Sequence, residues 1–427
     1  MSSRETKSHI LEGTGDMSKL VVMKFGGSSV ADADRIKNVA NRVIAKRKGG
    51  NRVVVVVSAP GDMTDDLIEM AEKITDNPSG REMDMLLSTG EQVSIALLSM
   101  AINERKVEAV SLTGPQAGIF ADNTHTRARI TDIKPVKIFS ELKKGRVVIV
   151  AGFQGLNANA DITTLGRGGS DLTAVALAAS LKADVCEIYT DVQGVYTTDP
   201  RLVPEAQKID RISFEEMLEL AGAGAQVMQP RSIEVGKKFG VDIHVRSSFI
   251  EDEGTLITAE VPRMEDVVVS GVAYDPKQAK ITLRNIPDRP GVAARVFGPL
   301  AEEGVNVDMI IQSAPESGRN DISFTIARGD TKKAMKVLDA VSGTLKPEEV
   351  VLDDKVAKVS IVGVGMRSHP GIAAKLFRAL ADGGVNIDMI STSEIKVACM
   401  VKEDDGPKAV RIAHKAFGLE KPHPKGK

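Results

Sequence analysis

The sequence is poor in the aromatic rings that many binding surfaces need. It contains no tryptophan, 3 tyrosines and 11 phenylalanines among 427 residues, whereas proteins that stack on nucleic-acid bases rely on such rings. An excess of charge of one sign is also missing, because 56 lysines and arginines face 58 aspartates and glutamates, a net charge of −2. A chain so balanced has no general attraction to nucleic acid or to an anionic membrane. We therefore expect neither as a partner.

Cysteine is scarce as well. The two cysteines, Cys186 and Cys399, are far apart and lie in the apolar runs "ADVCEIYT" and "KVACMV". This favours two buried thiols over a disulfide or a metal site, and it fits a reducing compartment such as the cytoplasm. The histidines His125, His244 and His369 have no cysteine or histidine at the spacing of a zinc site.

Long apolar runs and several familiar motifs are absent from the sequence. No run reaches the roughly 18 residues of a membrane-spanning helix, so no membrane span is expected. The polar residues 1–18 lack the apolar core of a signal peptide, and we expect a disordered extension there. The sequence contains no G-x-x-x-x-G-K-[ST], no G-x-S-x-G and no protein-kinase catalytic loop.

Short apolar segments alternate with helix-like segments from about residue 20 to residue 260. Four of them read as buried strands: "LVVMKF", "RVVVVVSA", "RVVIVAGF" and "VCEIYTDV". Their continuous hydrophobicity indicates strands covered on both faces, as in a mainly parallel sheet between two helical layers. Two of the expected helices are "REMDMLLSTGEQVSIALLSMAI" and "SFEEMLELAGAGAQVM", and the second opens with the capping-box spacing of Ser213 and Glu216. We predict a three-layer α/β domain over 19–262, with ligands bound beyond the carboxyl ends of the strands.

An internal repeat follows. "DRPGVAARVFGPLAEEGVNVDMI" (288–310) aligns without a gap to "SHPGIAAKLFRALADGGVNIDMI" (368–390), at a separation of 80 residues. Each copy has a strand before it, then a proline-glycine turn, an amphipathic helix, a glycine and a second strand. We predict two small α+β domains, over 263–350 and 351–427. The turn at each helix start offers free N–H groups to a ligand carboxylate, although the duplication could also be structural only.

Two glycine-containing motifs near strand ends carry the strongest chemical signal. In "KFGGSS", Gly26 and Gly27 allow a phosphate close to the backbone, Ser28 and Ser29 add hydroxyls, and Lys24 adds a positive charge. Alone, this pattern is as typical of an ordinary turn.

The second motif is "TTLGRGGSD". It combines Arg167, a planar fork for a carboxylate, with Gly168, Gly169 and Ser170, and places Asp171 in the first turn of an alanine-rich helix. An aspartate is favoured there merely as a cap, but the combination exceeds what a cap requires.

Three further stretches supply polar groups. "SAPGDMTD" offers the hydroxyls of Ser58 and Thr64 beside a turn. Glu91 lies in a helix-like apolar stretch, where a carboxylate needs a partner such as a cation or a ligand amine. "YTDVQGVYTTDPR" ends a strand and continues into a loop, and an ordinary turn would look similar; its polar candidates are Thr190, Asp191, Tyr196 and Arg201.

These motifs, in this order and followed by the two repeats, resemble the aspartate kinase family. Over about residues 19 to 415 the sequence is similar to an amino acid kinase domain followed by two tandem ACT domains of ferredoxin-like α+β fold. The resemblance implies transfer of the γ-phosphoryl group of ATP to the side-chain carboxylate of L-aspartate, with Mg²⁺ bound through ATP rather than by protein side chains. That reaction leads to lysine, threonine, methionine and diaminopimelate. It also implies a homo-oligomer, or association with a regulatory subunit, through the ACT domains.

The resemblance also implies a role for each matching residue. Lys24 and Asp171 would be catalytic, and a third group would bind aspartate: Ser58, Thr64, Glu91, Arg167, Gly168, Gly169 and Ser170. The ATP site would comprise Lys24, Phe25, Gly26, Gly27, Ser28, Thr190, Asp191, Tyr196, Arg201 and Gln226. Feedback by lysine, threonine or both would act through Asp288, Gly291, Asn306, Val307, Asp308, Gln312, Asn386 and Asp388.

Two departures from the family pattern are visible. Gln226 in "AQVMQP" replaces a lysine common near the nucleotide, and the two repeat turns differ, with Asp288 in the first and Ser368 and His369 in the second. The copies should therefore not bind alike. Two alternatives stay open: another amino acid kinase, acting on glutamate or acetylglutamate, and an inactive amino-acid sensor. The repeats and the set Thr64, Glu91 and Arg167 disfavour the first. Intact Lys24, Arg167 and Asp171 disfavour the second.

Overall fold

The structure is a computed structural model that describes residues 18–225, 227–259, 261 and 268–421. Gln226 and the predicted extension, except Ser18, lie outside the described residues. The chain divides into two compact units. Unit 1 contains the residues up to Gln193 together with Val235–Asp252, and unit 2 contains Gly194–Glu234 and Glu253–Lys427. The segment predicted as one kinase domain is thus shared between the two units.

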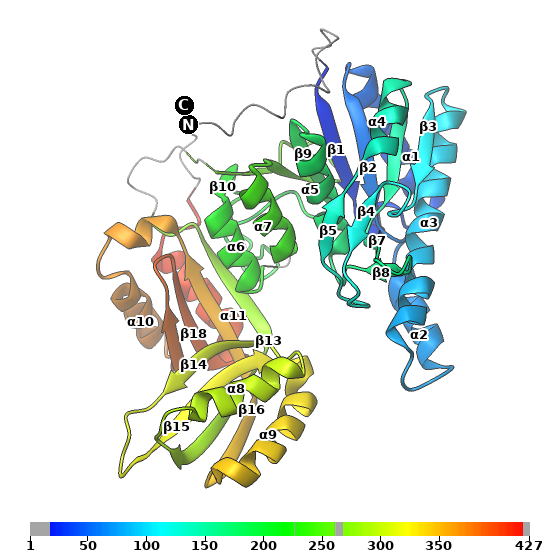
Figure 1. The fold of residues 1–427 in the computed structure, drawn as a ribbon. Helices are drawn as coiled ribbons and strands as arrows, with labels where there is room; N and C mark the ends of the chain where they lie inside the picture. Colours follow the sequence, from blue (N-terminus) through cyan, green and yellow to red (C-terminus); the bar gives the residue numbers. More distant parts are fainter. Residues whose placement is uncertain (1–17, 226, 260, 262–267, 422–427) are drawn as a thin grey trace, which may run out of the picture. The chain divides into compact units, whose positions relative to one another are not determined.

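Unit 1 is built on a parallel sheet with the strand order β11-β9-β1-β2-β6-β3, of which Figure 1 labels β9, β1, β2 and β3. Its strands are β1 (Leu20–Phe25), β2 (Arg52–Val57), β3 (Ala109–Leu112), β6 (Val147–Ala151), β9 (Val185–Thr190) and β11 (Ile243–Ser247). All pairings among them are parallel. The four apolar segments predicted as buried strands are β1, β2, β6 and β9, so this prediction is confirmed.

Helices cover both faces of this sheet. Alternate strand residues, such as Met23, Val55 and Ile149, pack in one core with α1 (Ala33–Lys48) and α3 (Gly80–Glu104). The strand residues that alternate with these face the opposite side of the sheet. On that side α5 (Gly169–Leu181) contacts β1, β2 and β9, and α4 (Val136–Lys143) contacts β6. The predicted three-layer arrangement is confirmed. Because Lys24 follows Met23, its side chain lies on the side of α5.

The remaining elements of unit 1 are a second, smaller sheet and the helices α2 and α3. A small sheet has the order β5-β4-β7-β8 and uses β4 (Ile119–Ala121), β5 (Ile130–Ile133), β7 (Gln154–Leu156) and β8 (Ile162–Thr164). Helix α2 (Met63–Glu72) packs on α3. By length and composition α3 would be able to cross a membrane, but it packs on α1, β3, β6 and β8 and buries Asp84 and Glu91 among them. It is a core helix of unit 1.

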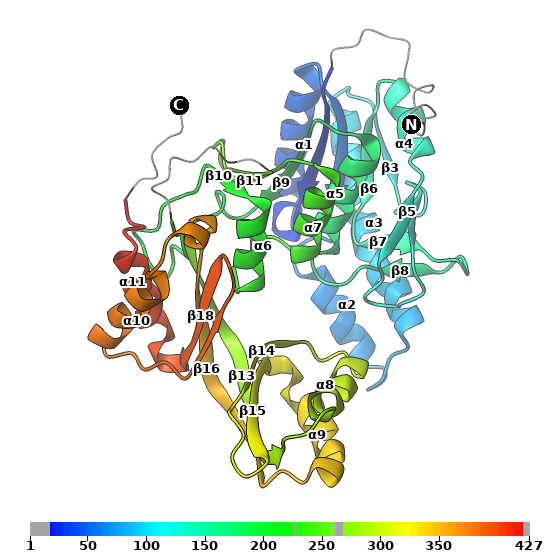
Figure 2. The same cartoon turned by 60° about the vertical axis from the view of Figure 1, so that its left-hand side comes forward.

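Unit 2 contains the two repeats, joined into one antiparallel sheet with the order β14-β15-β13-β16-β18-β17. The strands are β13 (Gly271–Pro287), β14 (Val307–Gln312), β15 (Arg319–Ala327), β16 (Glu349–Val362), β17 (Met389–Thr392) and β18 (Lys396–Lys402). Figure 2 shows α8 (Val292–Glu302) beside α9 (Thr331–Leu345) in the first repeat. The second repeat has α10 (Ile372–Asp382) and α11 (Gly406–Ala416). The strand-turn-helix-strand pattern of both repeats is confirmed.

Each repeat has its own core, but the chain crosses between them. Leu283, Val296 and Phe324 belong to the first core. The second core includes Val272, which lies before the repeated segment 288–310 in sequence and pairs with β16 opposite Ile361. The two repeats therefore share strands β13 and β16 and form one continuous structure.

The rest of unit 2 comes from the predicted kinase segment. It contains the parallel pair β10 (Arg211–Ser213) and β12 (Thr255–Thr258), with α6 (Phe214–Gly222), while α7 (Pro230–Phe239) spans the division between the units. The capping box of Ser213 and Glu216 is present. The helix predicted to continue to residue 228 ends at Gly222 instead, because Gly224 adopts a φ of 121° that helices do not contain.

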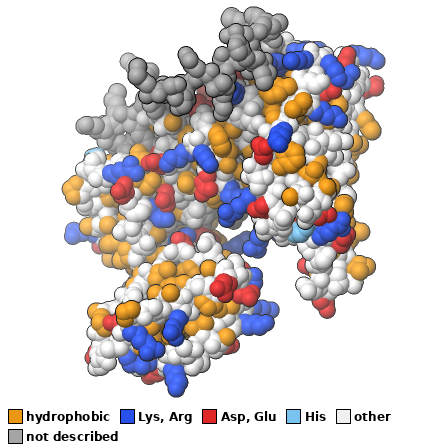
Figure 3. Space-filling view, in the orientation of Figure 1, with side chains coloured by type: hydrophobic (Ala, Val, Ile, Leu, Met, Phe, Trp, Pro, Cys, Tyr) orange, Lys and Arg blue, Asp and Glu red, His pale blue; other side chains and the backbone are white. Residues whose placement is uncertain are grey.

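The surface carries charges of both signs. On the face shown in Figure 3, basic and acidic side chains of the described residues are interspersed rather than gathered in one patch, as the near-neutral composition leads one to expect.

Candidate active site and effector pocket

A buried ion pair lies at the carboxyl end of strand β1. Lys24 Nζ is 2.6 Å from Asp171 Oδ1, and both side chains are 11% exposed. Lys24 is the fifth residue of β1, and Asp171 lies in the first turn of α5, where the helix dipole favours a carboxylate. The pair thus links two of the predicted motifs. It fixes a positive charge at the sheet edge where parallel α/β proteins bind ligands.

The glycine turn after β1 surrounds this lysine. A Cβ at Gly26 would lie 3.5 Å from Lys24 Nζ, so the missing side chain leaves the ammonium group open on that side. Gly27 has a different role, because a Cβ there would lie 2.9 Å from the carbonyl oxygens of Ala59 and Gly61. The turn is held against the loop after β2 by two backbone hydrogen bonds, from Ser58 N to Phe25 O and from Gly61 N to Gly27 O, both 3.1 Å.

The side chains around this turn point in different directions. Phe25 is buried and stacks on Tyr189 with ring centroids 4.6 Å apart. Its side chain therefore does not reach a nucleotide, and the contact predicted for this residue would be made by its backbone. Ser29 Oγ is 2.6 Å from Ser248 Oγ and is buried, whereas the side chain of Ser28 makes no hydrogen bond among those found between described residues. Thr190 and Asp191 follow β9, and Thr190 Oγ1 donates to Asp191 Oδ1 at 3.0 Å.

Glu91 is a buried carboxyl group with one unused oxygen. The residue is 3% exposed, and its Oε1 accepts a hydrogen bond of 3.2 Å from Ala59 N. Within the described part of the chain, Oε2 has no hydrogen-bond partner although it is buried. Burial raises the pKa of Glu91 to about 7, and the backbone hydrogen bonds lower it only in part. Among the described residues, no cationic side chain forms an ion pair with Glu91, and a ligand amine is the other partner that the sequence suggests.

The turn that carries Arg167 is shaped by glycine. Gly166 and Gly168 have φ values of 81° and 72°, in the left-handed region, and Gly169 has no room for a Cβ beside Leu165 and Phe153. Arg167 is 93% exposed, with its Nη2 3.4 Å from Asp65 Oδ1 on α2. Ser170 is buried against Gly152. Thr64, at the start of α2, is half-buried. The structure therefore presents Arg167 to solvent and Glu91 to the interior.

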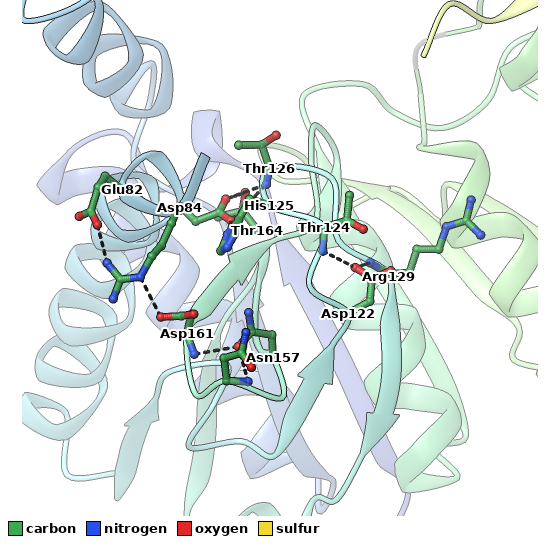
Figure 4. A network of polar contacts seen from close by, with 12 residues as sticks. Glu82, Asp84, Asp122, Thr124, His125, Thr126, Arg129, Asn157, Asp161 and Thr164 are labelled. Atoms are coloured by element: carbon green, nitrogen blue, oxygen red, sulfur yellow. Dashed lines mark hydrogen bonds and ion pairs between the residues drawn. The ribbon is translucent and has the colours of Figure 1, made fainter. Parts of the chain in front are cut away.

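A buried polar network, which the sequence did not reveal, holds the start of this turn (Figure 4). Asp84 of α3 is fully buried and accepts hydrogen bonds from Thr164 Oγ1 at 2.5 Å and from Thr126 N at 3.0 Å. Its other oxygen lies 2.7 Å from His125 Nδ1. A buried carboxylate is tolerated when several donors surround it. Through this contact His125 fastens its loop to α3. The sequence indicates this network only through the spacing of two acidic residues, because Asp84 precedes Glu91 by two helical turns in the same predicted helix.

Removing Asp84 should therefore destabilise unit 1. Asp84→Ala leaves three donors without an acceptor, and we expect the free energy of unfolding to fall by about 2–3 kcal/mol. The matched control is Asp161→Asn, which removes the half-exposed pair with Arg81 on the same side of α3. It should cost less than about 1 kcal/mol. Urea denaturation of both variants checks this, and equal losses would contradict it.

The predicted effector residues separate into two groups. A cavity of about 410 Å³ in the first repeat is lined by Asp288, Gly291 and Gln312, and by Asn320, which was not predicted. Asn320 Nδ2 donates to Asp288 Oδ1 at 2.9 Å, while its own Oδ1 is buried and has no partner among the described residues. Gly291 begins α8 with a φ of 90°. This is the proline-glycine turn recognised as a candidate carboxylate site.

The other predicted effector residues do not line this cavity. Asp308 Oδ2 is 2.5 Å from Lys358 Nζ, and Asp388 Oδ2 is 2.6 Å from Lys280 Nζ. Each aspartate thus pairs with a lysine of the other repeat, in a reciprocal arrangement. Asn306, Val307 and Asn386 also lie outside the lining.

The loop after β9 belongs to unit 2 from Gly194 onward. Arg201 forms hydrogen bonds to both carboxylate oxygens of Asp199, the shorter 2.7 Å, and Tyr196 pairs with Lys208 in an isolated β-bridge. The predicted nucleotide residues therefore come from both units: Lys24, Gly26, Thr190 and Asp191 from unit 1, and Tyr196 and Arg201 from unit 2.

Comparison with known proteins agrees with this geometry. Residues 19–247 match the model of the amino acid kinase family, and residues 284–341 and 359–417 match an ACT domain. The aspartokinase of Mycolicibacterium smegmatis is 50% identical over 405 residues, which cover 94% of this chain and 96% of that protein. The chain belongs to the aspartokinase family.

Other aspartokinases support this membership. The Corynebacterium glutamicum enzyme is 51% identical over 406 residues, 94% of this chain and 96% of that one. Among solved structures, E. coli aspartokinase III in complex with aspartate and ADP is 27% identical, with a TM-score of 0.80 over 93% of this chain and 99% of that chain. The same enzyme in complex with lysine and aspartate is also 27% identical and gives a TM-score of 0.75 over 94% of this chain and 100% of that chain.

The family match confirms several predictions made from sequence. The mainly parallel amino acid kinase fold followed by antiparallel ACT domains is that of aspartokinases. An aspartate kinase, rather than a glutamate or acetylglutamate kinase, is the enzyme that the relatives at about 50% identity indicate. The individual site residues and the domain limits of 19–262, 263–350 and 351–427 stay predictions.

Proposed function

We propose that this chain transfers the γ-phosphoryl group of ATP to the side-chain carboxylate of L-aspartate. The observation that carries this proposal is the buried pair of Lys24 and Asp171, 2.6 Å apart beside the open backbone of Gly26. The nucleophile is a carboxylate that is ionised at pH 7, so no general base is needed. What the reaction needs is in-line positioning and neutralisation of charge on the transferring group.

In this proposal the phosphates of ATP lie at the glycine turn. Lys24 is the point charge that meets the γ-phosphate, Asp171 holds its ammonium group in place, and the N–H groups of Gly27 and Ser28 donate to phosphate oxygens. Gly26, whose own N–H donates to Tyr189 O at 3.4 Å, contributes by the absence of a side chain beside the phosphates. A Cβ at Gly26 would lie 3.5 Å from Lys24 Nζ, so the absent side chain leaves that side of the ammonium group uncovered. Thr190, Asp191, Tyr196 and Arg201 contact the rest of the nucleotide. Gln226, outside the described residues, contributes no charge.

Aspartate is held by a cation and an anion of unit 1. Arg167, whose guanidinium group is exposed, would bind a substrate carboxylate. Glu91 offers its unused Oε2 to the α-ammonium group, which would supply the missing cationic partner. Ser58, Thr64 and the segment Gly168–Ser170 complete this site. Mg²⁺ would be held through the phosphate oxygens of ATP and would neutralise part of their charge.

We further propose that lysine, alone or together with threonine, regulates the enzyme through the cavity at Asp288, and that the ACT repeats mediate homo-oligomer formation or association with a regulatory subunit. The carboxylate of Asp288 would face the effector's ammonium group, and the N–H groups at the start of α8 its carboxylate. The two free, buried thiols suit a cytoplasmic enzyme. Residues 19–262 would carry catalysis, and 263–350 and 351–427 regulation.

Loss of Asp288 should relieve feedback without impairing catalysis. For Asp288→Ala we expect the lysine concentration for half inhibition to rise at least about tenfold, because a charged contact to the ligand disappears, while uninhibited turnover stays within about twofold of the wild type. The control is Asp339→Ala, an exposed aspartate on α9 of the same repeat. Unchanged inhibition in Asp288→Ala would place the effector elsewhere.

One assay tests the proposed function. Acyl phosphate formed with ATP is trapped with hydroxylamine, using aspartate or glutamate as acceptor, each with and without lysine and threonine. Hydroxamate from aspartate alone, suppressed by an effector, is the expected result. Product from glutamate would favour another amino acid kinase, and an effector that binds without any product would favour the sensor.

A further inference from the structure

The buried carboxylate of Asp84 is connected to both segments that shape the turn of Arg167. Its Oδ1 accepts a hydrogen bond of 2.5 Å from Thr164 Oγ1, three residues before Arg167, and one of 3.0 Å from Thr126 N in the neighbouring loop. Figure 4 shows Thr126 and Thr164 meeting at Asp84. The two segments are also joined to each other, because Ala128 N donates to Thr164 O at 2.9 Å. One side chain thus ties the strand before the turn and the loop beside it to helix α3.

The loop held by Asp84 lies directly against the turn. A Cβ at Gly166 would be 3.3 Å from Thr126 O, and Gly166 has a φ of 81°, in the left-handed region that favours glycine. The preceding residue, Leu165, is 1% exposed and packs in one core cluster with Leu172 of α5. The backbone that leads into Arg167 is therefore fixed by a polar anchor at α3 and by an apolar anchor at α5.

The position of this backbone matters because the side chain of Arg167 is 93% exposed. Packing does not hold a side chain that is so exposed, so the backbone of the turn largely decides where the guanidinium group can reach. A misplacement of about 1 Å in a group that positions substrate can lower a rate about 100-fold. Small shifts of the turn should therefore be felt by a ligand carboxylate.

The same helix carries the other proposed contact to aspartate. Asp84 and Glu91 are seven residues apart on α3, two helical turns, so their side chains lie on one face of the helix. Both residues are buried, at 0% and 3% exposure. Helix α3 therefore sets the place of Glu91 directly and the place of Arg167 through Asp84.

We propose that Asp84 is a positioning residue for aspartate binding, which keeps the carboxylate contact of Arg167 at a fixed distance from the ammonium contact of Glu91. This rests on the proposed function, in which Arg167 and Glu91 bind the charged groups of the acceptor. All three residues belong to unit 1. Lys24 and Asp171 are held separately, because their elements β1 and α5 pack on each other. Loss of Asp84 should therefore weaken aspartate binding and leave ATP affinity alone.

A residue that only stabilised the fold would behave differently. Its loss would lower the fraction of folded enzyme, which reduces the apparent kcat but leaves the KM for each substrate unchanged, because KM does not depend on the amount of enzyme. A change in the KM for aspartate alone is therefore the mark of a positioning role.

The test compares two substitutions of Asp84 in the full-length enzyme, by initial rates of hydroxamate formation. Asp84→Ala removes the acceptor, whereas Asp84→Asn keeps a carbonyl oxygen for Thr164 Oγ1 and Thr126 N. We expect Asp84→Ala to raise the KM for aspartate at least about tenfold, the usual worth of one hydrogen bond to a charged group. The KM for ATP should stay within about twofold, and Asp84→Asn should bring the KM for aspartate back to within about threefold of the wild type.

A milder variant and a control accompany this pair, because Asp84→Ala is also expected to unfold more easily. Thr164→Val removes one donor to Asp84 and should raise the KM for aspartate about threefold. Asp161→Asn removes the ion pair with Arg81 of α3, outside the contacts of Asp84, and should match the wild type in both KM values.

Three outcomes would overturn the proposal. The first is an unchanged KM for aspartate in both Asp84→Ala and Thr164→Val. The second is an equal rise of the KM for aspartate and for ATP, which indicates a general disturbance of unit 1. The third is a wild-type enzyme that forms no aspartyl hydroxamate, which would overturn the proposed function as well. The wild-type assay thus separates failure of the proposed function from failure of the positioning role alone.

Discussion

Asp171→Ala should lower kcat by about 100-fold or more, as the loss of a preorganised electrostatic group typically does. Lys24 lies 2.6 Å from Asp171 in a site where both side chains are mostly buried. Without its partner the ammonium group of Lys24 is free to turn away from the transferring phosphoryl group. Because the lysine is needed most when charge develops in the transition state, kcat should fall far more than the affinity for ATP.

The control residue for this prediction is Asp184, which contacts the first residue of strand β1, whereas Lys24 lies near the last. Asp184 Oδ2 accepts a hydrogen bond of 2.7 Å from Leu20 N, at the start of β1, and Asp184→Asn should keep kcat within about twofold. If Lys24 and Asp171 act as one unit, the double variant Lys24→Met, Asp171→Ala should be little worse than the poorer single variant. Near-normal turnover in Asp171→Ala would remove the basis of the proposed site.

Sequence patterns predicted those parts of this structure that depend on local periodicity. The continuous apolar runs of β1 and β2 indicated strands covered on both faces, and the gapless alignment of the repeat predicted two like modules. The helix limit at Gly222 was missed because an apolar run continues beyond it, and only the positive φ of Gly224 ends the helix.

Long-range pairing was beyond the reach of these patterns. Asn320 meets Asp288 across 32 residues, and His414 meets Thr197 across 217, contacts that no local spacing encodes. The ion pairs of Asp308 and Asp388 with lysines of the other repeat are likewise long-range contacts that the sequence did not reveal, and the part of these two residues in effector binding stays a prediction. The tertiary fold determines which buried polar groups become partners, so the sequence alone does not predict these pairs.

Glu91→Gln should weaken aspartate binding while it stabilises the free enzyme. Glutamine keeps an oxygen for Ala59 N but has no charge for the substrate ammonium group, so we expect the KM for aspartate to rise about 100-fold. In the wild type the KM for aspartate should also rise as the pH falls below about 7, because the pKa of Glu91 is raised to about 7 and protonation removes the charge that binds substrate. The variant should lose this pH dependence.

The stability change follows from the same raised pKa. Between its ordinary value of 4.5 and about 7, the folded protein holds a proton on Glu91 that the unfolded chain has released. The free energy of unfolding therefore falls as the pH rises through this range. Glutamine cannot ionise, so Glu91→Gln should gain up to about 3 kcal/mol at pH 8 and little near pH 5.

Urea denaturation at pH 5 and pH 8 measures this gain, with the exposed Glu82→Gln on the same helix as a control that should change by less than about 0.5 kcal/mol at either pH. If Glu91→Gln is no more stable than the wild type at pH 8, the carboxyl group already has a cationic partner in the free enzyme. The unused Oε2 would then not be reserved for aspartate. A gain in stability coupled to a loss of affinity is instead the mark of a buried charge retained for its ligand.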